Sequence, residues 1–441
     1  MRRRILFVWP VYGGVPGINN GISAMAGSLK AHGFKVKLFM PSKDQDLSTE
    51  IKRFDPDVIG FSCNVLQRRH ILDWGKFFRS YFYDAKIVVG GPDVILNPKY
   101  YAELSFVDYV CLGEGDTAIV DLMKGQPSNN IVSSSEIRDD SDFRIELVDL
   151  SKLEPEDFSI YNWDAIMIER HGWLGEFFIG RGCPYSCTYC SNIRIREAWH
   201  VCPKDYVRFK SIENVIREIR WGISNYTGSD VPVIVFGDDT FTVSYAHMIE
   251  FLPTYAKEIG FPFVCNINPL AFDEKKAEVL RKYGCFQVKM GLETGIDQLR
   301  NQILGRKEKT ADIEKAFSIA RDANLQVSVF IMLGIPGETL DTLNETLLLL
   351  GKLKPDRFKM SIFYPFSGTQ LYDYCVENDL IDFSKLGQQD NWTEDTVLRF
   401  SEPIRARIAE IIQDVGAAVN QVCGQDIYKT AFGNFGMKKL E

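Results

Sequence analysis

Residues 182–190 read Gly-Cys-Pro-Tyr-Ser-Cys-Thr-Tyr-Cys and place three thiols, Cys183, Cys187 and Cys190, in a C-x3-C-x2-C spacing. The run follows an apolar, strand-like stretch, so the three cysteines share one tight loop at a strand end. Thiolates are the usual ligands of iron–sulfur clusters, and a 4Fe–4S cluster normally takes four of them. Three thiolates on one loop therefore bind three irons and leave the fourth iron open.

An open iron in such a cluster supports a particular reaction. It can chelate the amino and carboxylate groups of S-adenosylmethionine (SAM) and pass an electron to the sulfonium, which allows homolysis of the S–C5′ bond; this chemistry belongs to the cofactor. The alternatives are three buried cysteines or a structural zinc site, but zinc sites use four ligands in paired spacings. His171 and His200 flank the loop without a metal-ligand spacing to it. The spacing therefore predicts a 4Fe–4S cluster.

Downstream of the loop, short apolar runs alternate with helix-like stretches up to about residue 366. This alternation is typical of βα units with a parallel sheet. Because only six units are present, the pattern predicts a (βα)6 partial TIM barrel rather than a complete one. The strand candidates are residues 177–179, 233–236, 263–267, 287–290, 327–332 and 358–362.

Upstream of the loop, the first 125 residues show the same alternation. A helical pattern over residues 21–32 ends at Gly33, a plausible helix stop. The pattern predicts a doubly wound, Rossmann-like parallel sheet with right-handed crossovers, whose ligands bind at the carboxyl ends of the strands. The strand candidates are residues 5–9, 36–40, 58–62, 87–89 and 109–112.

Two polar stretches divide the chain. Residues 124–143 are turn-rich and predict a linker, and the chain is polar again from about residue 380, before a helical pattern over 404–422 and a Gly-rich tail. The predicted fold class is therefore α/β, with a small helical carboxy-terminal region. The predicted domains are 1–140, 141–375 and 376–441.

Composition limits the classes of partner. The net charge of −8 and pI near 5.4 disfavour a nucleic-acid ligand, which usually requires a basic surface. No apolar run is long enough to span a membrane, and the run that ends at Pro10 is too short for a signal-peptide core. We therefore expect a cytoplasmic protein, in which most of the ten cysteines are small buried hydrophobic residues.

With an aromatic residue before its last cysteine, the loop resembles the defining motif of the radical SAM superfamily. Four further segments resemble family motifs at the ends of successive strands: residues 236–241 (an acidic strand end), 291–295 (the strand-four G-x-E-S segment), 333–339 (the loop behind the adenine) and 364–369. The resemblance implies as SAM-binding residues Tyr189, Asp238, Glu293, Thr294, Gly334, Pro336 and Glu338.

The first domain resembles the cobalamin-binding domain that precedes the barrel in one large radical SAM class. The strand-one loop is neither G-x-G-x-x-G nor a P-loop. Strand-end glycines let a flat corrin approach the backbone, and Ser62 and Asn64 can hydrogen-bond its dimethylbenzimidazole or amide groups. The resemblance implies as cobalamin-binding residues Tyr12, Gly13, Ser62, Asn64, Leu66, Gly90, Gly91, Pro92, Gly113 and Glu114.

This domain departs from the methionine-synthase-like pattern, which carries a D-x-H-x-x-G histidine on the strand-one loop. Residues 9–14 read Trp-Pro-Val-Tyr-Gly-Gly, and His32 is expected at the far end of the following helix. We therefore expect no lower histidine ligand to cobalt.

The resemblance to cobalamin-dependent (class B) radical SAM methyltransferases implies a C-methyltransferase that acts on an unactivated carbon. One SAM gives methylcobalamin, a second gives the 5′-deoxyadenosyl radical, and ferredoxin or flavodoxin supplies electrons. The substrate is left open between a protein residue, such as a glutamine of methyl-coenzyme M reductase, and a small natural-product intermediate.

Four alternatives remain: a cyclase or ring-rearranging enzyme, a polar sp2-carbon methylase, a methylthiotransferase and a cobalamin sensor with an inactive barrel. A methylthiotransferase usually needs three more amino-terminal cysteines, and only Cys63 and Cys111 lie there. A sensor would have no need for the complete cysteine trio.

Overall fold

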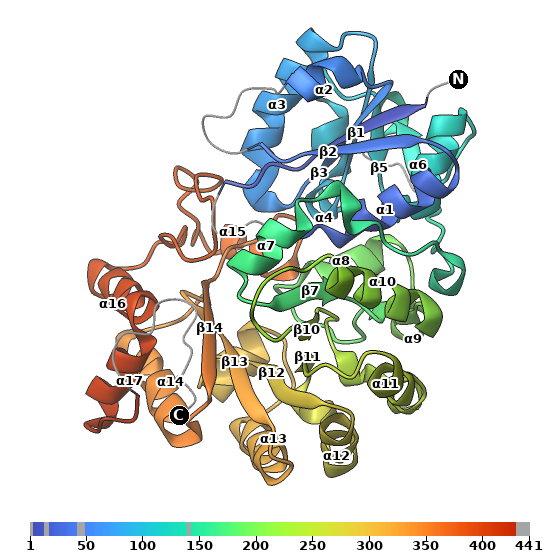
Figure 1. The fold of residues 1–441 in the computed structure, drawn as a ribbon. Coiled ribbons are helices and arrows are strands. Elements are labelled where there is room, and N and C mark those ends of the chain that lie inside the picture. The colour runs from blue at the N-terminus through green and yellow to red at the C-terminus, as the bar shows by residue number, and fades with distance from the viewer. Residues whose placement is uncertain (1–2, 13–16, 42–48, 139–142, 429–441) are drawn as a thin grey trace. The chain divides into compact units, whose positions relative to one another are not determined.

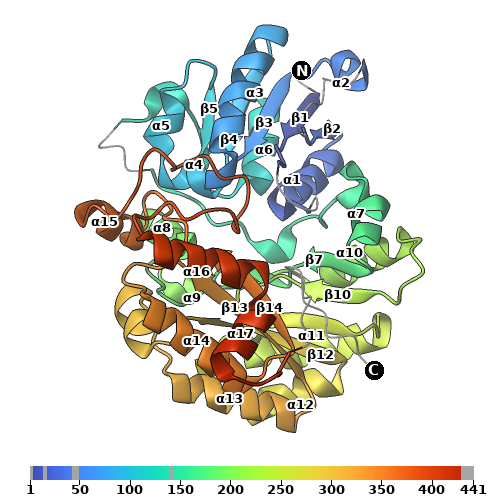
Figure 2. The same cartoon turned by 90° about the vertical axis from the view of Figure 1, so that its left-hand side faces the viewer.

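The structure is a computed structural model that describes residues 3–12, 17–41, 49–138 and 143–428. The chain divides into two compact units, drawn together in Figures 1 and 2 and treated separately below. The first unit contains residues 1–184, 191–232 and 366–368, and the second contains residues 185–190, 233–365 and 369–441. The predicted domain boundaries at residues 140 and 375 stay a prediction.

A six-stranded sheet forms the centre of the first unit. Its strand order is β2-β1-β3-β4-β5-β6, with every neighbouring pair parallel except β5 and β6. The strands are β1 (Arg4–Val8), β2 (Lys35–Phe39), β3 (Val58–Ser62), β4 (Lys86–Gly90), β5 (Tyr109–Cys111) and β6 (Ile131–Ser133). The order reverses between β1 and β3, which is the switch point where such sheets bind ligands.

Helices cover both faces of this sheet, as a doubly wound fold requires. Alternate strand residues such as Leu6 and Ile59 pack with residues of α3, whereas Ile5 and Val88 pack with residues of α1 and α6. The helices that follow these strands are α1 (Asn20–Ala31), α2 (Thr49–Phe54), α3 (Arg68–Tyr81), α4 (Pro92–Leu96), α5 (Pro98–Ala102) and α6 (Gly115–Lys124).

The five strands predicted for this sheet are present, with bounds that differ by a residue or two. The predicted linker over 124–143 is wrong at residues 131–133, which form the antiparallel edge strand β6. A three-residue strand between polar turn residues is too short to show the alternation from which a strand is recognised.

The remainder of the first unit precedes and follows the cysteine loop in the sequence. The predicted strand 177–179 is wrong: β7 ends at Phe177, and Gly175 and Glu176 interrupt its apolar pattern. Its elements are α7 (Trp163–Glu169), β7 (Trp173–Phe177), β8 (Gly180–Arg181), α8 (Ser191–Ala198), α9 (Pro203–Tyr206), β9 (Arg208–Phe209) and α10 (Ile212–Ser224).

The second unit contains a parallel sheet in the order β14-β13-β12-β11-β10. Its outer face is apolar: Val327, Val329 and Ile331 of β13 are at most 1% exposed. Figures 1 and 2 show α12, α13 and α14 along that side. The strands are β10 (Val233–Phe236), β11 (Phe263–Ile267), β12 (Cys285–Glu293), β13 (Gln326–Leu333) and β14 (Arg357–Ile362), and the helices are α11 (Tyr245–Glu258), α12 (Glu274–Lys282), α13 (Thr310–Asp322) and α14 (Leu340–Leu353).

The carboxy-terminal region is helical, as predicted. The single helical pattern over 404–422 is instead two helices, because the side chain of Asp414 accepts a hydrogen bond from the Ala417 amide and begins a new helix. The helices are α15 (Gln370–Glu377), α16 (Glu402–Gln413) and α17 (Val415–Cys423). In the described part of the chain, no helix has the length and apolar character needed to cross a membrane.

Candidate functional site

The carboxy-terminal half of the cysteine loop is fixed within the second unit. The amide of Thr188 donates to the Leu304 carbonyl (3.1 Å), and its hydroxyl donates to the Ile303 carbonyl (2.5 Å). Both acceptors lie at the end of a single π-helical turn, η7 (Leu299–Ile303). The Cys190 amide donates to the Cys187 carbonyl (3.1 Å), so these two cysteines flank one tight turn.

The first cysteine is fixed within the first unit. Arg196 of α8 is buried and donates to the carbonyls of Cys183 (3.4 Å) and Pro184 (3.2 Å). Gly182 has φ +95°, and a Cβ there would lie 2.2 Å from the Tyr206 carbonyl oxygen, so only glycine fits before Cys183.

The donor set suits an iron–sulfur cluster. Cys183, Cys187 and Cys190 are half-buried cysteines, whereas Cys63, Cys111, Cys265, Cys285 and Cys375 are buried as predicted. Among the described residues, no three His, Cys, Asp or Glu side chains converge on a single metal ion. A 4Fe–4S cluster does not need that convergence, because each thiolate binds a different iron.

Glu293, at the carboxyl end of β12, lies beside the cysteine loop. Tyr189 donates to its Oε1 (3.3 Å), and Nη1 of Arg306 donates to the same oxygen (2.9 Å). The register between β12 and β13 shifts between Gly291 and Glu293, and Glu293 has φ +62°, so the chain kinks where this carboxylate is presented. Burial raises the pKa of Glu293, and the Arg306 charge opposes that shift.

The sequence did not point to Arg306. This arginine is 9% exposed and pairs with both Glu293 and Glu308. It reaches Glu293 because the chain turns back through η7, and no pattern in the sequence predicts that turn.

Two other predicted SAM-binding residues of the second unit, Asp238 and Thr294, are buried and make different contacts. Asp238 is buried, and its carbonyl accepts from Nδ2 of Asn266 (2.8 Å). The Thr294 hydroxyl is fully buried and lies 3.4 Å from the Thr346 hydroxyl on α14. Thr294 thus has a packing contact that the sequence did not reveal.

The loop after β13 is closed by its own glutamate. Oε2 of Glu338 accepts from the amides of Gly334 (2.5 Å) and Ile335 (3.3 Å), while Oε1 is buried and has no hydrogen-bond partner in the described part of the chain. Burial raises the pKa of Glu338 to about 8. Gly334 has φ +71°, and Pro336 is buried in the same loop.

The predicted cobalamin residues of β3 and β4 lie at the carboxyl ends of these strands. Ser62 accepts from Nδ2 of Asn19 (2.9 Å), and Asn64 caps the turn η1 (Val65–Gln67) by accepting from the amide of the buried Leu66 (3.0 Å). Gln67 donates to the Pro10 carbonyl (3.0 Å), which joins this turn to the strand-one loop at the switch point. This arrangement fits a ligand at the strand ends.

The packing of the protein itself, and not only the approach of a corrin, explains the glycines at the end of β4. Gly91 has φ +106°, and a Cβ there would lie 2.5 Å from the Cys63 carbonyl oxygen. A Cβ on Gly90 would lie 3.0 Å from Cβ of Cys111, and Pro92 begins α4. The close approach of neighbouring backbone therefore already requires glycine at position 91.

The strand-one loop presents an aromatic group. Tyr12 stacks on His70 with ring centroids 3.8 Å apart, and its hydroxyl accepts from Nε1 of Trp74 (2.8 Å). The sequence did not single out His70. His32 lies beyond the far end of α1, as predicted. Gly13 lies outside the described residues, and the absence of a histidine below cobalt stays a prediction.

Glu114 is held in an ion-pair network. Its two oxygens accept from Nη1 and Nη2 of Arg208 (both 2.8 Å), and the amide of Val148 donates to Oε2 (2.9 Å). Arg181 also contacts it (3.2 Å) and makes two 2.8 Å bonds to Asp116. These contacts show a structural role for Glu114 that the sequence did not predict.

The arginines of this network stabilise the ionised form of its buried aspartate, Asp116. Burial works to raise the pKa of Asp116, but the charge of Arg181 and its hydrogen bonds outweigh burial and lower that pKa. A Cβ on Gly113 would lie 2.6 Å from Asn130, so the segment before Glu114 is also closely packed.

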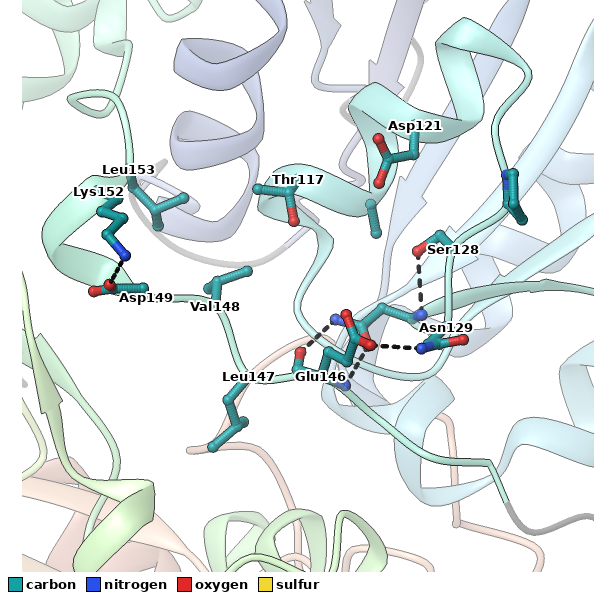
Figure 3. Close-up of a pocket in the computed structure, with 13 residues that line it drawn as sticks. Thr117, Asp121, Ser128, Asn129, Glu146, Leu147, Val148, Asp149, Lys152 and Leu153 are labelled. Atoms are coloured by element: carbon teal, nitrogen blue, oxygen red, sulfur yellow. Dashed lines mark hydrogen bonds and ion pairs between the residues drawn. The ribbon is translucent and has the colours of Figure 1, made fainter.

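A surface pocket of about 550 Å³ lies near this network in the first unit. Figure 3 shows Asp121, Glu146 and Lys152 among its lining residues, with Lys152 paired to Asp149. None of the predicted cobalamin residues lines this pocket.

Two family models match the chain: the B12 binding domain over residues 13–123 and the radical SAM superfamily over residues 177–350. An uncharacterized methyltransferase of Pyrococcus horikoshii is 24% identical over 76% of this chain and 73% of its own length. The anaerobic magnesium-protoporphyrin IX monomethyl ester cyclase of Rubrivivax gelatinosus is 23% identical, with 87% of this chain and 72% of the relative covered.

Among solved structures, the radical SAM methyltransferase TsrM of Kitasatospora setae, with cobalamin and a [4Fe–4S] cluster bound, is similar in fold. Its TM-score is 0.66 at 17% identity, over 86% of this chain and 75% of that chain. The predicted fold class, a Rossmann-like sheet with a partial barrel and a helical end, is confirmed. The predicted cofactors, a 4Fe–4S cluster, SAM and cobalamin, are likewise confirmed. The chain therefore combines a B12 binding domain with a radical SAM domain, and its relatives and structural neighbours include cobalamin-dependent radical SAM methyltransferases.

Proposed function

We propose that the chain methylates an unactivated carbon of a small molecule or a protein residue, with electrons from a ferredoxin or flavodoxin. When bound, the cluster supplies the electron that cleaves SAM, and the corrin carries the methyl group that the substrate receives. Cys183, Cys187 and Cys190 would hold the cluster, and the ends of β3 and β4 would hold the corrin.

The contact between Tyr189 and Glu293 carries this proposal. Tyr189 is one residue from Cys190, so a ligand that reaches Glu293 also lies beside the thiols. An ionised carboxylate only accepts hydrogen bonds, which suits the ribose hydroxyls of SAM. Burial raises the pKa of Glu293, and the cation of Arg306 opposes that shift.

The other residues of the second unit support a nucleoside at the same strand ends. Glu338 holds the Gly334 loop closed through two backbone amides, which keeps a buried surface beside the strand end. Asp238 is buried at the end of β10, where its carboxylate suits the amino group of SAM.

A cyclase is the second candidate, because the Rubrivivax gelatinosus relative bears that name and is matched over most of this chain. Product mass separates the two reactions: methylation adds one methyl group to the substrate, and cyclisation adds none.

The test uses the anaerobically reconstituted full chain with SAM, a reductant and candidate substrates. We expect 5′-deoxyadenosine and S-adenosylhomocysteine in about equal amounts, because one SAM is cleaved and one gives up its methyl group in each turnover. Deuterium at the reacting carbon should appear in the 5′-deoxyadenosine. The Cys183→Ala, Cys187→Ala, Cys190→Ala triple variant should make no 5′-deoxyadenosine.

Two results would contradict the proposal. Methylated product without any 5′-deoxyadenosine would indicate polar methylation of an sp2 carbon. A triple variant that still binds a complete cluster would remove the three cysteines from the site. The matched control is Cys202→Ala, which removes an exposed thiol that is not assigned to the cluster.

A further inference from the structure

Arg300 is a fully buried arginine that holds the backbone on both sides of Glu293. Its side chain is 0% exposed. Nε donates to the Leu292 carbonyl (3.3 Å), and Nη2 donates to the Thr294 carbonyl. A guanidinium suits this arrangement, because its N–H groups point in fixed directions within one plane. One side chain therefore binds the two carbonyls that flank the proposed ribose ligand.

The segment that Arg300 holds is a strained three-residue turn. The Thr294 amide donates to the Leu292 carbonyl (2.8 Å), which places Glu293 at the centre of the turn. Glu293 has φ +62°, a conformation that is unfavourable for a residue with a Cβ. Backbone strain of this kind persists only where surrounding contacts hold it, and it is common at ligand-binding positions. The two hydrogen bonds from Arg300 are contacts that hold it.

The burial of Arg300 is costly for the fold. Taking a guanidinium out of water is unfavourable unless it is paired and hydrogen-bonded, and its carboxylate partner, Asp297 (2.6 Å), is 46% exposed. Burial lowers the pKa of Arg300, and the charge of Asp297 opposes that shift. An apolar side chain would fill the position at a lower cost, but it could not bind two carbonyls. Stability of the core alone therefore does not explain an arginine here.

The turn that carries Arg300 also holds the cysteine loop. Arg300 belongs to η7, whose last carbonyl, that of Ile303, accepts from the Thr188 hydroxyl. The next carbonyl, that of Leu304, accepts from the Thr188 amide. Single π-helical turns are frequent at functional sites. One turn therefore fixes both the carboxy-terminal half of the cysteine loop and the backbone of Glu293.

We propose that Arg300 is a positioning residue for SAM, because its guanidinium holds the turn that presents the Glu293 carboxylate to the ribose hydroxyls. This inference rests on the proposed function, in which Glu293 binds the ribose. A group that is already held in place binds more tightly, since the ligand does not have to order it. The competing explanation is that Arg300 only stabilises the second unit. The two explanations differ because a positioning role disappears when the carboxylate itself is removed.

The test is a double-mutant cycle on SAM affinity. SAM is titrated calorimetrically into the anaerobically reconstituted full chain with cobalamin bound and the cluster kept oxidised, so that no electron is available to cleave SAM. Glu293→Gln should weaken binding about tenfold, as expected for the loss of a hydrogen bond to a charged group. Arg300→Met should weaken it about five- to tenfold and Arg300→Lys about threefold, since lysine lacks the planar fork. In the Glu293→Gln background, the same substitutions should change affinity less than about twofold.

The matched control is Arg321→Met. Arg321 also donates to two backbone carbonyls, those of Leu353 and Lys354 at the end of α14. Its loss should lower the stability of the second unit but leave SAM affinity at the wild-type value. If Arg300→Met does not fold, Arg300→Lys, which keeps the buried cation, carries the same comparison.

Two outcomes would overturn the inference. One is wild-type SAM affinity in both Arg300 variants. The other is an equal loss of affinity with and without the Glu293 carboxylate, which would show that Arg300 acts on the fold and not on Glu293. Failure of the proposed function is separate, because it appears as wild-type SAM affinity in Glu293→Gln, or as absence of 5′-deoxyadenosine from the wild type, whatever the Arg300 variants do.

Discussion

The Asp116 network of the first unit and the Glu338 loop of the second unit hold their buried carboxylates in opposite ways. In the first unit, Asp116 and Glu114 are each contacted by arginine, and Lys210 donates to both Glu156 (2.8 Å) and Glu218 (2.5 Å). In the second unit, Glu338 is held by two backbone amides, and among the residues that the structure describes its Oε1 has no hydrogen-bond partner.

This difference separates charges that fix the fold from charges near the proposed chemistry. A buried ion pair sets the position of its two segments, because breaking it leaves an uncompensated charge. Arg181 is two residues before Cys183, so the network also fixes the approach to the cysteine loop. Glu338 is less fully compensated, because its Oε1 has no hydrogen-bond partner among the described residues, and perturbed groups of that kind are common at functional sites.

The largest effect should come from Arg181→Met. This variant leaves Asp116, whose side chain is 4% exposed, without its bidentate partner. We expect the free energy of unfolding of the first unit to fall by about 3 kcal/mol, the lower end for a broken buried pair because Arg181 is itself partly exposed. Chemical denaturation followed by circular dichroism measures the loss.

The control for that loss is Arg217→Met. Arg217 pairs with Glu213 on α10, but both side chains are more than half exposed, so the change should be within about 0.5 kcal/mol. An equal effect in the two variants would mean that burial does not distinguish the Arg181 network from a surface pair.

A second comparison concerns one glycine in each unit. Gly91→Ala combines φ +106° with a Cβ placed 2.5 Å from the Cys63 carbonyl oxygen, and should cost about 2–3 kcal/mol. Gly334 has φ +71°, and a Cβ there would lie 3.5 Å from its nearest neighbours. Gly334→Ala should therefore cost only the strain of the left-handed backbone, about 1 kcal/mol of the free energy of unfolding. Thermal denaturation of the two variants should therefore rank Gly91→Ala as the less stable, and the reverse order would show that the β3 and β4 ends can separate.

The sequence predicted those elements whose signal is local. Fully buried parallel strands are continuous apolar runs, and the predicted strands 58–62, 233–236 and 263–267 agree with the structure at both ends. The strand β6 was missed because its three residues give no pattern.

Residues of the candidate site could be predicted where a motif coincides with the end of a strand. Contacts between side chains that are far apart in the sequence could not be predicted. Glu293 could be named from its segment, but its pairing with Arg306 depends on η7. Glu114 was assigned to cobalamin from a family resemblance, and its contacts with Arg181 and Arg208, 67 and 94 residues away, could not be predicted from the sequence. Long-range ion pairs of this kind leave no spacing in a single sequence.

The two kinds of carboxylate should also differ in the pH dependence of the stability that they confer. Burial raises the pKa of Glu338 from its ordinary 4.5 to about 8, so between these values the unfolded chain has released a proton that the folded chain keeps. Stability should therefore fall as pH rises through this window, by at most about 1.4 kcal/mol per pH unit. Glu338→Gln still accepts from the Gly334 amide but does not titrate, so its unfolding free energy should change less between pH 5.5 and 7.5.

Asp116→Asn provides the matched contrast for this measurement. The pKa of Asp116 is lowered by Arg181, so its contribution to stability is complete above its ordinary value of 3.8 and is lost only as pH falls below that value. Between pH 5.5 and 7.5, Asp116→Asn should lower stability by a constant amount, parallel to the wild type, whereas Glu338→Gln should diverge from it. Parallel curves for Glu338→Gln would mean that the carboxyl at position 338 is ionised in the folded chain, and that the two units treat their buried carboxylates alike.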